Sequence, residues 1–183
     1  MSRTRHTVCR TVPDPAARPG PYRAVSSWWA QIVTADVNSH RLIVIRDGQE
    51  VMNFPASYGL AADPQRHTTN GIHVVMSKSE KVLMSNPKYG YVNLPMHWAV
   101  RVSNYGEFIH ANPASTGAQG SANVTHGCVN LSTANAKQYF DTAIFGDPVE
   151  VTNSPTQLSA AHGDIYDWTV PWNSWQAMSA LHP

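Results

Sequence analysis

The sequence has few charged residues, few cysteines and no long apolar run. Charged side chains make up 14% of the 183 residues, and Lys and Arg outnumber Asp and Glu by only 13 to 12. The longest uninterrupted apolar run, Leu42–Ile45, is much shorter than the ~20 residues of a membrane-spanning helix, so we expect no transmembrane segment. The two cysteines, Cys9 and Cys128, do not make the spaced set that indicates a disulfide framework. A chain of this length and composition is predicted to form one globular domain.

The small net charge conceals a basic N-terminal arm. Five of the nine arginines lie within residues 1–23, which hold a single acidic residue and are interrupted by four prolines. No apolar stretch follows these arginines, so the arm lacks the hydrophobic region of a signal peptide. We therefore expect residues 1–24 to be a basic, proline-rich, disordered leader or a truncated remnant. The rest of the chain is slightly acidic, which argues against nucleic-acid binding, because a phosphate backbone requires a basic surface.

Short β-branched runs with turn signals between them predict a sheet-rich domain over residues 25–152. The first two runs flank Asp47-Gly48, a dipeptide that favours a type I′ turn between antiparallel strands. The next run ends at Pro55. Further strands are expected at residues 71–76, 98–102, 107–110 and 148–151. Strands of this length and spacing indicate a mainly β fold.

Three other segments are predicted from local signals. Residues 77–95 are polar and turn-rich, and we expect a long hairpin or flap that covers a site. A helix is predicted over residues 133–145, because Ser132 can cap its N-terminus and Gly146 can end it. Residues 153–183 form a tail that contains three tryptophans within eight residues, Trp168, Trp172 and Trp175. Aromatic area of this size is seldom left in water, so the tail is expected to pack on the domain.

The residues that carry chemistry are concentrated between positions 104 and 131. Cys128 precedes the predicted helix, and Gly127 before it allows a tight backbone turn. A thiol near a helix N-terminus and beside histidines is expected to have a stabilised thiolate and to be nucleophilic at neutral pH. The backbone N–H groups of His126, Gly127 and Cys128 are expected to converge on an oxyanion.

Two histidines are candidates for the base that activates this thiol. His126 is only two residues from Cys128, and side chains so spaced on a turn can diverge, whereas His110 ends a predicted strand and can approach from a neighbouring one. We therefore favour His110. No Asp or Glu occurs from residue 108 to residue 140, so a local group that orients this histidine must be a backbone carbonyl or an amide side chain. The carbonyl of Ala111, or of a nearby loop residue, is the candidate.

The segment from His110 to Asn130 resembles the active-site signature of the L,D-transpeptidase (YkuD) family, because His110 is followed by Thr125-His126-Gly127-Cys128-Val129-Asn130. The resemblance extends over about residues 30–180, and the tryptophan-rich tail is most similar to the actinobacterial, mycobacterial-type branch. It implies a YkuD-like β-sandwich with one helix after the catalytic cysteine and a flap hairpin over the site.

The resemblance also implies roles for individual residues. Cys128 would be the nucleophile, His110 its general base and His126 a supporting residue. The donor-substrate site would be lined by Tyr105, Gly106 and Asn130, with Tyr89 on the flap above it.

These roles imply an acyltransferase that acts on peptidoglycan without a cofactor or metal. Cys128 would attack the carbonyl before the terminal D-alanine of a donor stem tetrapeptide, D-alanine would leave, and a thioester would remain. An amine of an acceptor stem would then displace the enzyme and form a 3→3 cross-link. Carbapenems would acylate Cys128 by the same route. We expect a monomer with an extracytoplasmic location, because the substrate lies outside the cytoplasm.

Three alternatives stay open from the sequence. Water in place of the acceptor amine would make the protein an L,D-carboxypeptidase. His110, His126 and Cys128 are ligand types that suit tetrahedral zinc, although the sequence has no Cys-x-x-Cys or His-x-x-x-His pair. The third alternative is an inactive cell-wall-binding module that uses Asn130 and the flap to hold a stem peptide, and the intact Cys128 and His110 argue against it.

Overall fold

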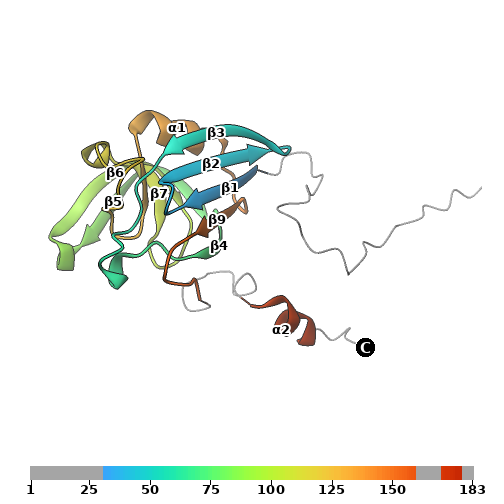
Figure 1. Cartoon of the computed structure of the whole chain (residues 1–183). Coiled ribbons are helices and arrows are strands. Elements are labelled where there is room, and N and C mark those ends of the chain that lie inside the picture. The colour runs from blue at the N-terminus through green and yellow to red at the C-terminus, as the bar shows by residue number, and fades with distance from the viewer. Residues whose placement is uncertain (1–30, 160–169, 179–183) are drawn as a thin grey trace, which may run out of the picture.

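The computed structural model describes residues 31–159 and 170–178, in which two β-sheets dominate (Figure 1). A five-stranded sheet has the order β3-β2-β1-β9-β4, and a four-stranded sheet has the order β5-β6-β7-β8. The first sheet contains β1 (Gln31–Asp36), β2 (Arg41–Arg46), β3 (Gln49–Pro55), β4 (Gly71–Val74) and β9 (Pro148–Thr152). The second contains β5 (Ser77–Asn86), β6 (Tyr91–Arg101), β7 (Phe108–Ala111) and β8 (Val129–Leu131). The mainly β fold predicted from the sequence is confirmed.

The turn between β2 and β3 has the geometry that its sequence predicts. Asp47 and Gly48 have φ angles of 51° and 75°, and a type I′ turn requires positive φ at both central residues. The strands on either side pair in antiparallel register, with Arg46 opposite Gln49. This hairpin forms the edge of the five-stranded sheet that lies farthest from β4.

Helix α1 (Thr133–Thr142) begins where the sequence predicts and ends three residues earlier. The hydroxyl of Ser132 accepts a hydrogen bond from the backbone N–H of Asn135 at 3.2 Å, as an N-cap does. Ala143 has an extended backbone (ψ 134°), so the helix stops there. The backbone N–H of Ile144 instead donates to the carboxyl of Asp147 at 3.0 Å. The predicted end at Phe145 is therefore wrong, because the Asp147 side chain binds the backbone N–H of Ile144, which would otherwise continue the helix.

The hydrophobic core lies between the two sheets and under α1. The first sheet contributes Val33, Leu42 and Val44, and the second contributes Val100, Ile109 and Leu131, all fully buried. Ala136 and Tyr139 bring α1 into the same core. This packing fixes β7 and β8, which pair in parallel with His110 opposite Asn130.

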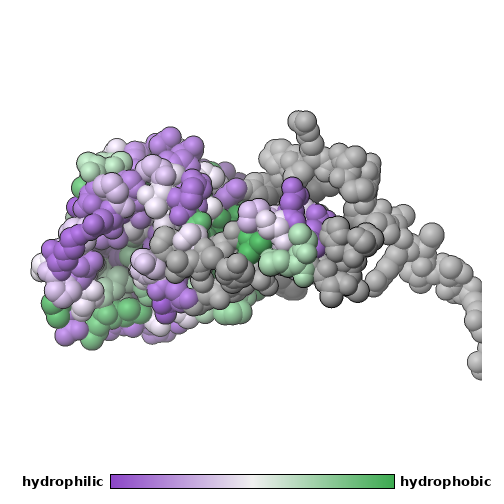
Figure 2. Space-filling model, turned by 90° about the horizontal axis from the view of Figure 1, so that it is seen from below, coloured by the Kyte–Doolittle hydropathy of each residue, from purple (hydrophilic) through white to green (hydrophobic). Residues whose placement is uncertain are grey.

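The β5–β6 hairpin is the predicted flap segment. The two strands turn at η2 (Pro87–Tyr89), where Gly90 adopts the left-handed conformation with φ 81°. Apolar side chains gather at the end of the molecule where this hairpin lies (Figure 2). Those that are exposed on the hairpin are Leu83, Val92 and Leu94.

The predicted terminal segments fall largely outside the described residues. The leader, residues 1–24, and Trp168 in the tail lie there. Within α2 (Trp172–Ala177), Trp172 and Trp175 are exposed and stack on each other, with ring centroids 5.5 Å apart. The packing of this tail on the domain and the three segment boundaries stay predictions. Across the described residues, the helices are too short or too polar to cross a membrane.

Candidate active site

Cys128 lies immediately before β8 and not at the N-terminus of a helix. The three residues of β8 separate it from Ser132, the N-cap of α1. Extended chain rises about 3.3 Å per residue, so the thiol is more than one helical turn away from the helix end. The influence of a helix dipole falls off within one turn. The prediction that this dipole stabilises a thiolate is therefore wrong.

The thiol of Cys128 is protonated at rest. Burial raises the pKa of Cys128 to about 12, and the nearby carboxylate of Glu107 acts in the same direction. A hydrogen bond from the backbone of Phe108 opposes the rise without overcoming it. The sulfur lies 3.7 Å from the carbonyl oxygen of Gly106, to which the thiol donates. Attack by this sulfur therefore requires a base that removes its proton during the reaction.

Thr125 holds the turn that carries Cys128. Its hydroxyl donates to the carbonyl of Cys128 at 2.6 Å and accepts from the backbone N–H of Gly127 at 3.2 Å. Gly127 has a φ of 112°, and a Cβ atom there would lie 3.4 Å from the carbonyl oxygen of His67. The turn therefore requires glycine. The N–H of Gly127 is already bonded to Thr125, so in this conformation it is not available as the expected oxyanion donor.

His110 is buried on β7 and has a fixed ring orientation. Its Nδ1 atom lies 2.9 Å from the carbonyl oxygen of Ala111, the carbonyl named from the sequence. Because a carbonyl only accepts, Nδ1 carries the proton, and Nε2 of the neutral ring has a free lone pair. Burial lowers the pKa of His110, and the hydrogen bond to Ala111 opposes this only in part. The ring is therefore neutral at neutral pH, the form that can accept a proton.

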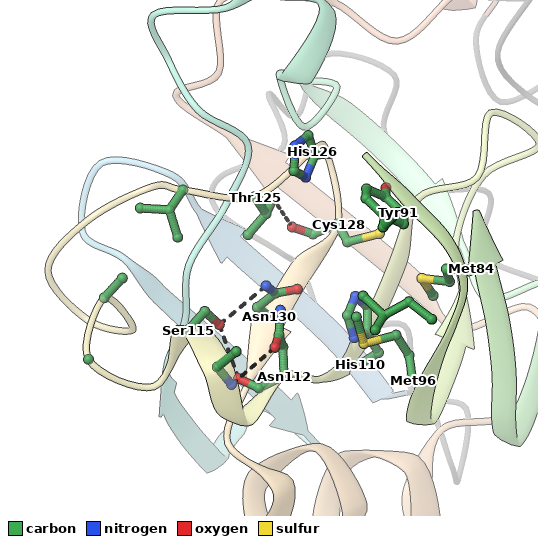
Figure 3. A pocket seen from close by; sticks show the side chains of 15 residues that line it. Met84, Tyr91, Met96, His110, Asn112, Ser115, Thr125, His126, Cys128 and Asn130 are labelled. Carbon is green, nitrogen blue, oxygen red and sulfur yellow. Dashed lines mark hydrogen bonds between the residues drawn. The ribbon is translucent and has the colours of Figure 1, made fainter. Parts of the chain in front are cut away.

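Cys128 and His110 share a pocket of about 480 Å³ (Figure 3). His126 and Asn130 line the same pocket. The flap contributes Met84, Tyr91, Leu94 and Met96, and the loop before Cys128 contributes Asn112, Ala114, Ser115, Gly117, Ala118, Val124 and Thr125. The pocket therefore combines a thiol, a neutral imidazole and apolar walls.

Asn130 presents an unused acceptor to this pocket. Its side chain is 4% exposed, and its amide nitrogen donates to the hydroxyl of Ser115 at 3.2 Å. Among the described residues, its amide oxygen has no hydrogen-bond partner. This oxygen points away from Ser115, toward the side of the pocket that holds His110 (Figure 3). A buried acceptor in this position suits an N–H group of a ligand.

His126 is exposed at the mouth of the pocket and packs on the flap. Its ring lies 4.5 Å from that of Tyr89 and 5.5 Å from that of Tyr91. Tyr89 is held in place because its hydroxyl donates to Asp63 at 3.1 Å. Partial burial and the positive charge of Arg66 lower the pKa of His126. This histidine thus joins the cysteine turn to the flap, and it does so as a neutral ring.

The structure brings most of the residues named from the sequence to one place. Cys128, His110, His126 and Asn130 line the pocket, Gly106 contacts the thiol, and Tyr89 packs on His126. Tyr105 is 69% exposed and is not among the residues that line the pocket.

Sequence reasoning missed several residues of the site. Tyr91, Met84, Met96, Asn112, Ser115 and Thr125 all line the pocket. For Tyr91, its place beside Tyr89 in the expected flap was the available signal. For Thr125, the signal was its position inside the motif, where a short hydroxyl side chain can bond neighbouring backbone groups.

The zinc alternative finds no support in the geometry. Over residues 31–159 and 170–178, no group of three or more His, Cys, Asp or Glu side chains could hold a metal ion.

Comparisons with known proteins identify the family of this chain. The model of the L,D-transpeptidase catalytic domain (YkuD) family matches residues 30–151. L,D-transpeptidase 5 of Mycobacterium tuberculosis is 58% identical over 153 residues, which are 84% of this chain and 34% of that protein. L,D-transpeptidase 2 of the same species is 38% identical over 156 residues, which are 81% of this chain and 38% of that protein. The chain thus spans 34% and 38% of the length of these two curated relatives.

Solved structures show the same similarity. The L,D-transpeptidase LdtMt1 in complex with imipenem superposes with a TM-score of 0.62 and 40% identity, over 67% of this chain and 59% of that chain. L,D-transpeptidase 3 of M. tuberculosis, in complex with a faropenem-derived adduct, superposes with a TM-score of 0.61 and 30% identity, over 68% of this chain and 60% of that chain. The sequence resemblance is confirmed, including the mycobacterial-type branch, and the chain belongs to the YkuD family of L,D-transpeptidase catalytic domains.

Proposed function

We propose that this protein is a peptidoglycan L,D-transpeptidase that forms 3→3 cross-links through a thioester on Cys128. The observation that carries the proposal is the shared pocket of Cys128 and His110, in which the Nδ1 atom of His110 is bonded to the Ala111 carbonyl. This bond leaves Nε2 as the ring atom that carries the lone pair. Nε2 is also the atom that can face the thiol.

The first half-reaction forms the thioester. Nε2 of His110 takes the proton of the Cys128 thiol while the sulfur attacks the carbonyl carbon before the terminal D-alanine of a donor stem. The C–N bond then breaks, and His110 returns the proton to the leaving amine of D-alanine. A neutral thiol and a neutral imidazole at rest suit this sequence, because attack and proton transfer occur together.

The second half-reaction transfers the acyl group. An amine of the acceptor stem attacks the thioester carbon, His110 removes a proton from this amine, and the Cys128 sulfur leaves and is reprotonated. The product is an amide bond between two stems, and the enzyme returns to its resting form.

Binding roles follow from the groups that face the pocket. A small rotation of the Asn130 side chain brings its buried amide oxygen to an N–H of the donor stem, which gives this acceptor a partner. The backbone N–H groups of His126 and Cys128 stabilise the oxyanion. Tyr89 supports the site through His126, and Tyr105 contacts the donor stem at the rim.

The comparisons extend the proposal to inhibitors and location. LdtMt1 was solved in complex with imipenem, and we infer that carbapenems acylate Cys128 in the same pocket. We also propose an extracytoplasmic location, since the proposed substrate is the cell wall. We further propose that the protein is a monomer.

A tetrapeptide assay tests the reaction. The protein is incubated with a stem tetrapeptide, and the products are separated and identified by mass spectrometry. Release of D-alanine together with a cross-linked dimer supports transpeptidation, whereas release with a free tripeptide alone would assign the protein as an L,D-carboxypeptidase. If the wild type releases no D-alanine and forms neither product, an acyltransferase function is contradicted. The Cys128→Ala variant is the control for non-enzymatic release.

A further inference from the structure

A buried polar cluster lies next to the cysteine turn and has no role in the reaction described so far. It consists of His73, which is 2% exposed, Glu107, which is 6% exposed, and Thr69. His73 belongs to β4 of the five-stranded sheet, and Glu107 lies in the turn between β6 and β7 of the other sheet. The cluster therefore links the two sheets beside the active site.

Both ring nitrogens of His73 face hydrogen-bond acceptors. Nδ1 lies 3.1 Å from the carbonyl oxygen of Val102, and Nε2 lies 2.8 Å from the carbonyl oxygen of Thr69. A neutral imidazole has one N–H and one lone pair, so it would place a lone pair against one of these oxygens. Only the imidazolium form donates to both. The hydroxyl of Thr69 also lies 3.4 Å from Nε2, but its proton is directed to the shorter contact with Glu107 at 2.9 Å. In a buried site, the unpaired contact of the neutral ring would therefore be costly.

Glu107 supplies the matching negative charge. One of its carboxyl oxygens lies 3.9 Å from Nδ1 of His73. The backbone N–H of Thr69 donates to this carboxyl group at 2.7 Å, and the hydroxyl of Thr69 donates to it at 2.9 Å. A buried charge is tolerated when it is both paired and hydrogen-bonded, and Glu107 has both kinds of partner.

The cluster contacts both segments that place the thiol. Glu107 directly follows Gly106, whose carbonyl oxygen accepts from the thiol of Cys128. On the other side, Thr68 precedes Thr69, and its hydroxyl donates to the carbonyl of Gly127 at 2.9 Å. A Cβ atom on Gly127 would lie 3.8 Å from the Cγ atom of Glu107, so the two segments also pack directly on each other.

The charge of Glu107 bears on the chemistry as well as on the geometry. A carboxylate near Cys128 opposes the negative charge that develops on the sulfur and on the substrate oxygen during attack. A partner of opposite charge would cancel this effect. The Nδ1 atom of His73 lies 3.9 Å from this carboxyl group, so a protonated His73 would be such a partner.

We propose that His73 and Glu107 form a buried imidazolium–carboxylate pair that positions the Gly106 carbonyl and the cysteine turn around the thiol of Cys128. Both are positioning residues, because neither lines the pocket. The pair also keeps the net charge beside the thiol near zero. The kinetic part of this inference rests on the proposed acylation of Cys128, and the protonation of His73 does not.

The protonation state of His73 is measured by NMR on the full chain. Two-bond ¹H–¹⁵N spectra distinguish an imidazolium from either neutral tautomer, and the His73→Gln variant identifies the signal by its loss. We expect both ring nitrogens of His73 to be protonated at neutral pH in the wild type. A neutral tautomer at neutral pH would overturn the proposal. In the Glu107→Gln variant, His73 is expected to become neutral.

Acylation kinetics test the positioning role. We expect Glu107→Gln and His73→Gln each to lower the rate constant of acylation by imipenem about 10- to 100-fold, the size of effect that follows from misplaced reacting groups. The matched control is Glu50→Gln, which removes an exposed carboxylate on β3 and should leave the rate unchanged. In the double variant, the fold decrease in the acylation rate constant should be smaller than the product of the two single-variant decreases, because both charges are removed together.

The outcomes separate the two proposals. A folded Glu107→Gln variant that is acylated at the wild-type rate would overturn the positioning role. If the variants do not fold, the His73 ring signals are assigned in the wild type by through-bond correlation to its backbone resonances, and that spectrum decides whether the pair exists. A wild type that is never acylated would contradict the proposed function and leave the NMR result to stand by itself.

Discussion

The Nδ1 atom of His110 lies 2.9 Å from the carbonyl oxygen of its own neighbour, Ala111. This contact fixes the tautomer of the ring without a carboxylate, in a stretch of sequence that contains no acidic residue from position 108 to position 140. A carbonyl stabilises an imidazolium less than a carboxylate does, and burial further lowers the pKa of His110. The ring is thus neutral at rest, with its Nε2 lone pair available to accept a proton.

Replacement of His110 by alanine should slow acylation of Cys128 about 10²- to 10⁴-fold, because the thiol would then lose its proton to water. The rate constant is measured by the loss of imipenem absorbance under single-turnover conditions. His97→Ala is the control, since His97 is an exposed histidine on β6. An unchanged rate in the His110 variant would move the role of base to another group.

The rate of acylation should fall in acidic solution, and the rate of Cys128 alkylation should show no plateau near neutral pH. The pKa of His110 is lowered, so acylation is expected to stay constant above about pH 6.5 and to fall only in more acidic solution, where the base becomes protonated. With the pKa of Cys128 raised to about 12, alkylation by iodoacetamide should keep rising with pH through the alkaline range. An alkylation plateau beginning near pH 7 would instead indicate a thiolate–imidazolium pair.

Thr125→Val should lower the acylation rate, because the variant loses the hydroxyl that bonds both the carbonyl of Cys128 and the N–H of Gly127. The expected loss is about 10- to 100-fold from the displaced thiol, together with about 1–2 kcal/mol of stability from the two lost hydrogen bonds. Thr125→Ser keeps the hydroxyl and should retain most of the activity. Equal activity in the valine and serine variants would show that the hydroxyl does not shape the turn.

Local signals predict the parts of this fold that form from neighbouring residues. The Asp47-Gly48 turn and the N-cap Ser132 depend on contacts within a few residues, and both are present. The flap segment also folds as a hairpin, whose strands pair outward from the turn between Asn86 and Tyr91. The motif around Cys128 and His110 likewise identifies the family, because its residue types and order are specific.

Other features depend on contacts between distant segments, and for these the sequence pattern was misleading or silent. The three residues of β8 are too few to show a strand periodicity, so Cys128 was placed against the helix. Tyr91 reaches the pocket only because β6 pairs with β7. The pairing of His73 with Glu107 requires the two sheets to pack together, which no short pattern encodes.

Intact-protein mass spectrometry after incubation with imipenem shows whether Cys128 is the nucleophile. We expect the wild type to gain the mass of one imipenem molecule, peptide mapping to place the adduct on Cys128, and Cys128→Ala to gain no mass. A wild type that remains unmodified, or an adduct that persists in the Cys128→Ala variant, would contradict the assignment of Cys128 as the nucleophile.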